Sequence, residues 1–192
     1  MFDLKAINPG LYENWLAVQE ASPEFFSPPD PAAVQELEAL AGGKLPDDYK
    51  SFLLKYGSVG GSMNTGVRYF HCQYPGREVI DADFGLISGA KHTIASTKIL
   101  SRPHLTLENV GARIPENMIA TNIDNYCTFL IDLRPDSFGR MYYISNLKKK
   151  TFGTPGYDWD NVAFVGKTFT EFMAGVGTKE QLKARYPKVK VR

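Results

Sequence analysis

The sequence has 192 residues, and its 22 Lys and Arg against 21 Asp and Glu give a formal net charge of +1. This length fits one domain, or one domain with an extension, and the 43% hydrophobic content is typical of globular chains that build their own core. A charge near zero argues against non-specific binding to nucleic acid or to an anionic membrane surface, because both favour a clear basic excess.

The first 29 residues predict a helical extension. Leu11, Trp15 and Val18 recur at helical spacing, which indicates a helix over residues 11–21. Four prolines in residues 22–31 then exclude regular structure and indicate a connector. We expect this extension, residues 1–29, to pack on the domain that follows.

A pair of short helices is the clearest local signal in the chain. Asp30–Pro31 predicts the first start, because the carboxylate accepts from a free backbone N–H and proline suits the first helical position. After Leu45–Pro46, Asp47 and Asp48 place negative charge at the start of the second helix, where the helix dipole favours it. The apolar stripe of this second helix consists of Tyr49, Phe52, Leu53 and Tyr56.

The pattern changes to strands after a glycine-rich loop over residues 57–62. Residues 66–74 and 77–85 indicate two strands around Pro75–Gly76, a hairpin turn. Residues 86–105 fit a helix, but their β-branched residues disfavour one, so the sequence leaves this segment open.

Three further β-rich runs over 118–123, 126–133 and 140–146 are separated by turn-forming residues, Asp124–Asn125 among them, and predict an antiparallel meander. A short strand over 162–165 follows. Thr168 and Glu171 form a capping box that opens a helix, Thr178 caps a last helix, and the chain ends in a basic tail.

This order of helices, antiparallel strands and helices predicts the α+β class. We expect a central, mostly antiparallel twisted sheet with helices from both ends of the chain packed around it. One domain covers residues 30–177, with the extension 1–29 before it and a C-terminal helix and basic tail, residues 178–192, after it.

The net charge conceals a gradient along the chain. Residues 1–48 carry two basic and nine acidic residues, a net of −7, whereas residues 148–192 carry ten basic and four acidic residues, a net of +6. One interpretation is solvated charge on surface helices and a disordered basic tail. The other is an acidic face that steers a basic partner onto the protein.

The sequence offers little for catalysis. His71 precedes Cys72, but adjacent residues of a strand point to opposite faces, so the imidazole cannot activate the thiol directly. Cys127 lies in a central strand, where a cysteine is usually a small core hydrophobe. Two cysteines without Cys/His ligand spacing predict neither a disulfide framework nor a metal site. We expect no catalytic residue, no metal and no cofactor.

Two carboxylates and a lysine run are further candidate sites. Asp81 and Asp83 share one face of a strand, as a metal or acid–base pair would, but the solvent face of an edge strand explains them equally simply. Lys148–Lys150 could touch phosphates, although such a run is usually solvated charge. The N-terminus lacks a basic start followed by an apolar run, and no stretch approaches about 18 apolar residues. We therefore expect a cytoplasmic protein with no membrane partner and no direct contact with nucleic acid.

The loop 156–161 is the best candidate for an interaction. Tyr157 and Trp159 stand among the acids Asp158 and Asp160, and Tyr and Trp are enriched at binding hot spots. The alternative is that Trp159 folds back as a lid on the sheet. The predicted partner-binding residues are Tyr157, Asp158, Trp159, Asp160, Glu36, Asp47, Asp48, Asp81 and Asp83.

The helix pair resembles the opening of the SUKH superfamily, the Smi–Knr type. Members show a helix with an apolar-Leu-Glu pattern, then Leu-Pro, an acidic or polar pair, an aromatic residue and Phe-Leu. This chain has VQELE at 34–38 and LPDDYKSFLLKYG at 45–57. Later segments agree in order and resemble the family's central hairpin, its Gly-x-aromatic strand and its closing Ser-Phe-x-x-Phe-Leu helix: Ile119–Thr121, Phe129–Asp132, Gly139–Tyr143 and Thr168–Met173. The resemblance spans residues 30–177.

This resemblance implies a non-enzymatic binding module. Bacterial members are commonly immunity proteins that bind and neutralise toxin domains, often nucleases, and fungal members act as regulatory scaffolds. We expect an immunity protein with a cognate toxin domain as its partner, with its acids meeting a basic toxin surface. The alternatives are a scaffold without a toxin partner and, last, a small hydrolase that uses Cys72 or the Asp81 and Asp83 face.

Overall fold

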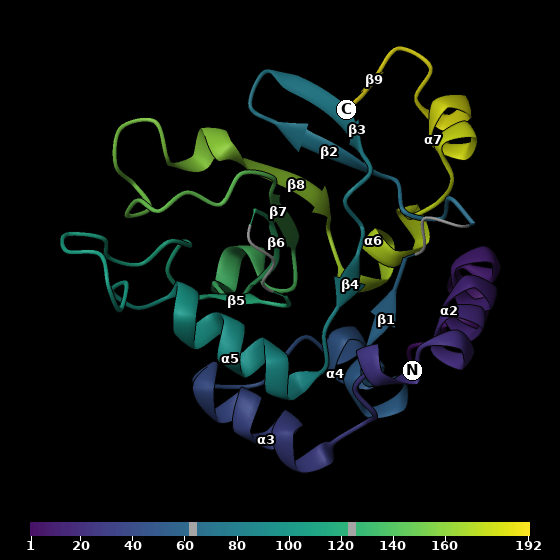
Figure 1. The fold of residues 1–192 in the computed structure, drawn as a ribbon, viewed down its shortest axis with the longest axis horizontal. Helices are drawn as coiled ribbons and strands as arrows, with labels where there is room; N and C mark the ends of the chain where they lie inside the picture. The colour runs from purple at the N-terminus through teal and green to yellow at the C-terminus, as the bar shows by residue number, and fades with distance from the viewer. Residues whose placement is uncertain (62–64, 123–125) are drawn as a thin grey trace.

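The computed structural model describes residues 1–61, 65–122 and 126–192 (Figure 1). Within these ranges, seven strands form one sheet in the order β5-β6-β7-β8-β2-β3-β9, and β1 and β4 form a separate two-stranded sheet. All neighbours in the large sheet are antiparallel except β3 and β9. The predicted α+β class with a mostly antiparallel sheet is confirmed.

The helices of the described residues are α1 (Leu4–Ile7), α2 (Pro9–Ala21), α3 (Pro31–Leu40), α4 (Asp47–Lys55), α5 (Ala90–Leu100), α6 (Phe169–Gly175) and α7 (Lys179–Arg185), and the 3-10 turns are η1 (Pro23–Phe25), η2 (Pro135–Ser137) and η3 (Trp159–Asn161). The strands are β1 (Val59–Gly60), β2 (Phe70–Tyr74), β3 (Arg77–Asp81), β4 (Leu86–Ile87), β5 (Met118–Ala120), β6 (Thr128–Asp132), β7 (Met141–Ile144), β8 (Val162–Gly166) and β9 (Lys190–Val191).

The helices begin where local chemistry predicts. The Asp30 side chain accepts from the N–H of Ala33 at the start of α3, and the Thr168 side chain accepts from Glu171 at the start of α6. Thr178 and Gln181 form a reciprocal capping box at α7. Each cap satisfies a backbone N–H that has no partner inside the helix, which fixes the first residue of the helix.

The two faces of the sheet carry different cores. The larger core joins the inner face to the helices, and rings such as Phe52, Phe129 and Phe169 are fully buried in it. The smaller core covers the outer face over β5, β6 and β7 and includes Leu100, Leu130, Ile144 and Tyr157. On β8 this second cover includes only Val162, and it has no member on β2, so part of the outer face stays open.

The N-terminal residues lie against the same inner core. Phe2 and Leu4 are buried there, and the backbone N–H of Leu4 donates to the Tyr56 hydroxyl at 3.0 Å. The Phe2 ring lies 5.4 Å from the Phe169 ring, centroid to centroid. The segment before residue 30 is thus in direct contact with α4 and α6.

Two segments differ from the sequence expectations. Residues 86–105, which the sequence left open, contain β4 and the helix α5. The tail that was expected to trail off forms β9, in which Lys190 pairs with Val79 and the N–H of Arg192 donates to Ile80 O at 2.8 Å. The predicted Asp124–Asn125 turn and the end of the 57–62 loop lie outside the described residues.

Candidate partner-binding surface

A row of side chains crosses the open part of the outer face. Trp159 lies 6.0 Å from Tyr142 and Tyr142 lies 5.9 Å from Phe164, ring centroid to ring centroid, in edge-to-face geometry. Phe164 stands directly opposite Gln73 in the register of β8 and β2, so the two side chains share this face. We call Trp159, Tyr142, Phe164 and Gln73 the outer row.

Trp159 is held in place although it remains accessible. It begins η3, where the Asp158 side chain accepts from the N–H of Asp160 at 3.0 Å. Its ring meets Phe152 edge-on at 5.7 Å, and 40% of the residue's surface is exposed. An exposed indole with its position fixed loses little conformational entropy when a partner binds.

Arg134 supports the indole from the other side. The guanidinium carbon of Arg134 lies 4.9 Å from the Trp159 ring centroid. Its nitrogens donate to Asp132, with an Nη2–Oδ2 distance of 2.6 Å, and the Ser137 hydroxyl donates to the same carboxylate at 2.7 Å. Burial alone would raise the pKa of the fully buried Asp132, but these donors hold the pKa below its usual value. A buried carboxylate thus orients a cation under the exposed Trp159.

Tyr157 does not belong to the exposed surface. It is fully buried, its hydroxyl donates to Arg113 O at 2.7 Å, and burial raises its pKa to about 12. Its ring meets Phe152 at 5.7 Å in the smaller core. The lid interpretation therefore applies to Tyr157, whose burial prevents a partner from contacting its ring in this conformation, whereas Trp159 remains available.

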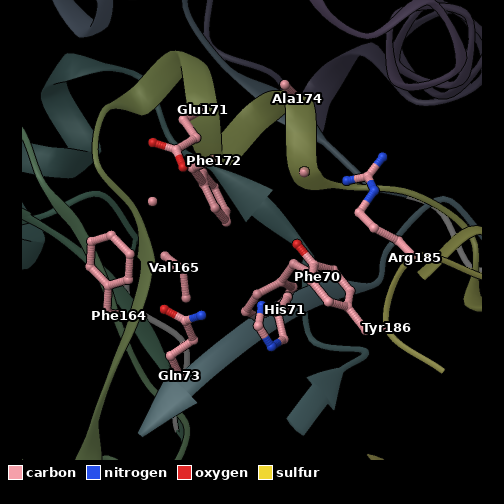
Figure 2. Close-up of a pocket in the computed structure, with 12 residues that line it drawn as sticks. Phe70, His71, Gln73, Phe164, Val165, Glu171, Phe172, Ala174, Arg185 and Tyr186 are labelled. Carbon is pink, nitrogen blue, oxygen red and sulfur yellow. The ribbon is translucent and has the colours of Figure 1, made fainter. Parts of the chain in front are cut away.

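A groove adjoins the outer row where β2 and β8 diverge. In the described residues these strands pair at one position, Gln73 with Phe164. The cavity of about 380 Å³ beyond that pair is bordered by Glu171 and Phe172 of α6 on one side and by Arg185 and Tyr186 on the other (Figure 2). His71 forms its floor: the imidazole stacks on Tyr186 at 4.0 Å, and Nε2 lies 3.0 Å from Glu78 Oε2.

The acids predicted on the N-terminal helices do not join this surface. Figure 1 shows α3 and α4 at the bottom of the view, while the segment before η3 is at the upper left. Glu36 lies 3.5 Å from Lys98, and Asp48 accepts from the N–H of Thr170 at 2.8 Å. Asp47 is exposed near the start of α4. These carboxylates belong to another region of the molecule.

Asp81 and Asp83 lie together, the first buried and the second exposed. Asp81 is only 2% exposed, and Asp83 donates its N–H to the Asp81 carboxylate at 3.2 Å. The Tyr143 hydroxyl donates to Asp83 at 3.1 Å, and Arg192 approaches Asp81 to 3.7 Å. Burial, together with the nearby charge of Asp83, raises the pKa of Asp81 to about 6. β3 is covered by β9, so the expected solvent face of an edge strand does not apply to Asp81.

The cysteine reading finds no geometric support. Cys72 is fully buried, and burial raises the pKa of its thiol, which disfavours the reactive thiolate. His71 stacks on Tyr186 on the opposite face of β2. In the part of the chain that the structure describes, no three His, Cys, Asp or Glu side chains gather where they could hold a metal ion. Among the same residues, no helix has the length and apolarity needed to cross a bilayer.

The fold and the open face define a small α+β domain built on an antiparallel sheet that exposes an aromatic row and a groove. The chain belongs to the SMI1 / KNR4 family (SUKH-1), whose family model matches residues 28–175. The resemblance found in the sequence over residues 30–177 is thereby confirmed. No curated protein matches the sequence.

The sequence prediction missed most of the outer row. The sequence predicts that Tyr142, Phe164 and Gln73 lie in strands, but it does not predict on which face of the sheet their side chains lie. Period-2 alternation does carry a signal, since Tyr142 lies between the buried residues Met141 and Tyr143, and Phe164 follows the buried Ala163. Without knowledge of which strands pair, however, that alternation does not bring the three residues together.

Proposed function

We propose that this protein is a non-enzymatic immunity protein that acts in the cytoplasm by binding and neutralising a cognate toxin domain. Membership of the SMI1 / KNR4 family supports this role. The observation that carries the proposal is the accessible Trp159, fixed by Arg134 and flanked by Tyr142. Trp, Tyr and Arg are the residues most enriched at protein-binding hot spots.

The outer row supplies the docking surface in this proposal. Its aromatic side chains bury large apolar areas on contact, and its supports are built into the fold before a partner arrives. Blocking the toxin requires only that the bound domain lose access to its substrate, so no catalytic group is needed on this chain. Cys72 is too deeply buried to favour a hydrolase.

The test co-expresses the protein with each candidate toxin domain from the genes that neighbour its own, in cells that the candidate kills. Wild-type protein is expected to restore growth and to bind the purified toxin domain. Trp159→Ala should weaken binding by about 30-fold or more, the effect of a hot-spot residue worth about 2 kcal/mol. Affinity is measured by calorimetry, and circular dichroism confirms that the fold is retained.

Phe25→Ala is the matched control, because Phe25 is an exposed aromatic residue at 69% exposure on η1, far from the outer row in sequence. Its affinity should stay within about twofold of wild type. Equal affinity of Trp159→Ala and wild type would remove the outer row as the interface. Two results together would favour the regulatory scaffold instead. The protein would fail to restore growth, and its specific partner would be a housekeeping protein.

A further inference from the structure

The two charged sections of the chain differ in how far their charge is neutralised. In residues 1–48, four carboxylates form ion pairs with lysines of α4 and α5, and these pairs are Asp3–Lys55 at 3.2 Å, Asp30–Lys91 at 2.8 Å, Glu36–Lys98 at 3.5 Å and Glu38–Lys50 at 2.8 Å. A fifth, Asp48, is held by Thr170. Much of the negative charge of this section is therefore already engaged within the molecule.

The basic section, residues 148–192, is left largely unpaired. Among the described residues, its one lysine or arginine in an ion pair is Arg192, which lies 3.7 Å from Asp81. Its C-terminal part from α7 onward is anchored to the domain, since Leu182 is buried and Tyr186 stacks on His71. The cations of this anchored segment that face solvent are Lys179, Lys183, Arg185, Lys188, Lys190 and Arg192.

Two of the C-terminal cations meet a third in a pocket at the end of the sheet. Arg77, Lys190 and Arg192 line a cavity of about 400 Å³, which we call the tail pocket. The neutral polar side chains in its lining are Tyr74, Ser145, Asn146 and Asn161, and no acidic residue of the described chain lines it. Asp81 is the nearest acid to Arg192, behind the lining.

Contacts within the tail pocket hold the side chains of its two arginines. Arg77 stands opposite Tyr74 across the hairpin turn, with its guanidinium carbon 4.5 Å from the ring centroid. Arg192 donates from Nη1 to Ser145 Oγ at 2.7 Å, and the Tyr74 hydroxyl donates to the same oxygen at 2.9 Å. The backbone of Lys190 pairs with Val79, which places this lysine in the lining of the pocket. In the described structure, the side chains of Arg77 and Lys190 have no carboxylate partner within ion-pair distance.

We propose that the tail pocket binds the side-chain carboxylates of an acidic segment on the protein partner. The pocket offers three cations and several neutral donors to an anion, and two guanidinium groups suit carboxylates through paired N–H donors. The identity of the partner rests on the proposed function. The sign of its charge is the reverse of the sequence expectation, in which acids of this chain would meet a basic surface.

The pocket favours carboxylates over a nucleic acid backbone. Binding of single-stranded nucleic acid uses open aromatic faces for base stacking along a basic track. Here Arg77 lies over the Tyr74 ring, no other ring of the described residues lines the pocket, and the whole chain carries only +1. A compact pocket at the end of one sheet fits a few carboxylates of a protein loop.

The test is an NMR titration at low salt with a tetraglutamate peptide whose two ends are blocked. The chemical shifts of the protein's backbone amides report binding. Saturable shifts are expected at Tyr74, Val79 and Ser145, and none with tetraglutamine. The double variant Arg77→Gln/Lys190→Gln should weaken the binding at least tenfold. The matched control Lys179→Gln/Lys183→Gln removes the same charge outside the tail pocket and should stay within about twofold.

Three results would overturn the proposal. These are equal weakening in both double variants, tighter binding of a single-stranded oligonucleotide than of tetraglutamate at these signals, and absence of saturable shifts with the peptide. A different variant tests the proposed function, so the two proposals can fail independently. Trp159→Ala leaves the tail pocket intact and should not alter the peptide titration, whereas it tests the outer row against the toxin domain.

Discussion

The acidic N-terminal section and the basic C-terminal section carry net charges of −7 and +6, yet only the second presents most of its charge to a partner. The carboxylates of the first section cap helices and pair with lysines of α4 and α5. Of the cations of the second section, only Arg192 lies in an ion pair among the described residues. The net charge of a segment therefore differs from the charge that a partner can contact, because ion pairs inside the fold neutralise some of its charged groups.

The largest expected effect concerns an acid that joins the two ends of the chain. Asp48 on α4 accepts from both the N–H and the hydroxyl of Thr170 on α6, at 2.8 and 3.0 Å. Asp48→Ala should lower the free energy of unfolding by about 2 kcal/mol, because charge-assisted bonds at a helix start are lost. Urea unfolding measures this. An unchanged midpoint would show that this carboxylate is not part of the fold's stability.

A second change probes the acid that faces the basic tail. The pKa of Asp81 in the folded state, about 6, exceeds its ordinary value of 3.8. The folded state therefore binds the proton of this carboxyl group more tightly than the unfolded state does, and ionisation of Asp81 at higher pH lowers the free energy of unfolding. Asp81→Asn should raise the free energy of unfolding by about 2 kcal/mol at pH 8. The gain should shrink as the pH falls through about 6 and vanish near 3.8.

Unfolding curves from pH 4 to pH 8 measure this dependence. Asp136→Asn, at an exposed turn position in η2, is the control and should show no such trend. A gain of the same size at every pH would mean that Asp81 acts through packing rather than through its charge.

The smallest expected effect separates two ion pairs of the acidic section. Glu38 contacts Lys50 at 2.8 Å and also accepts from the N–H of Leu45, while the exposed Glu36 reaches Lys98 only at 3.5 Å. The Lys50 ammonium lowers the pKa of Glu38, so its contribution is present above about pH 4.5 and is lost as the pH falls below that value. Glu38→Gln should cost about 0.5 kcal/mol after solvent screening.

Thermal unfolding at low and high salt measures this difference at pH 7. Glu36→Gln should leave the midpoint unchanged, and salt should reduce the effect of Glu38→Gln. Equal effects of the two variants would show that the two ion pairs contribute equally to the stability of the fold.

Local chemistry in the sequence predicted the helix starts well. Asp30, Thr168 and Thr178 cap the helices they were expected to cap, because a cap depends on atoms a few residues away. The hairpin of β2 and β3 and the strands β5, β6 and β7 followed from alternation and turn residues in the same way.

Tertiary contacts decided what the sequence could not. In α5, Thr93 bonds to the Tyr49 hydroxyl at 3.1 Å and Thr97 accepts from the N–H of Ala120 at 3.0 Å, so its β-branched residues serve packing with distant elements. In the 156–161 loop, both aromatics had the same composition signal. Both rings meet Phe152, but Tyr157 is fully buried with its hydroxyl on Arg113 O, whereas Trp159 stays 40% exposed beside Arg134. Contacts with residues distant in sequence therefore separate the two.

The pairing of β9 with β3 has a consequence for synthesis. Val79 and Lys190 meet although they lie at opposite ends of the sheet-forming part of the chain, and contacts between such distant residues form late. Until residues 190–191 pair with β3, the hydrogen-bonding edge of β3 has no cover and can pair with another chain. Docking of β9 thus ends the period in which this edge of a folding molecule is exposed to aggregation.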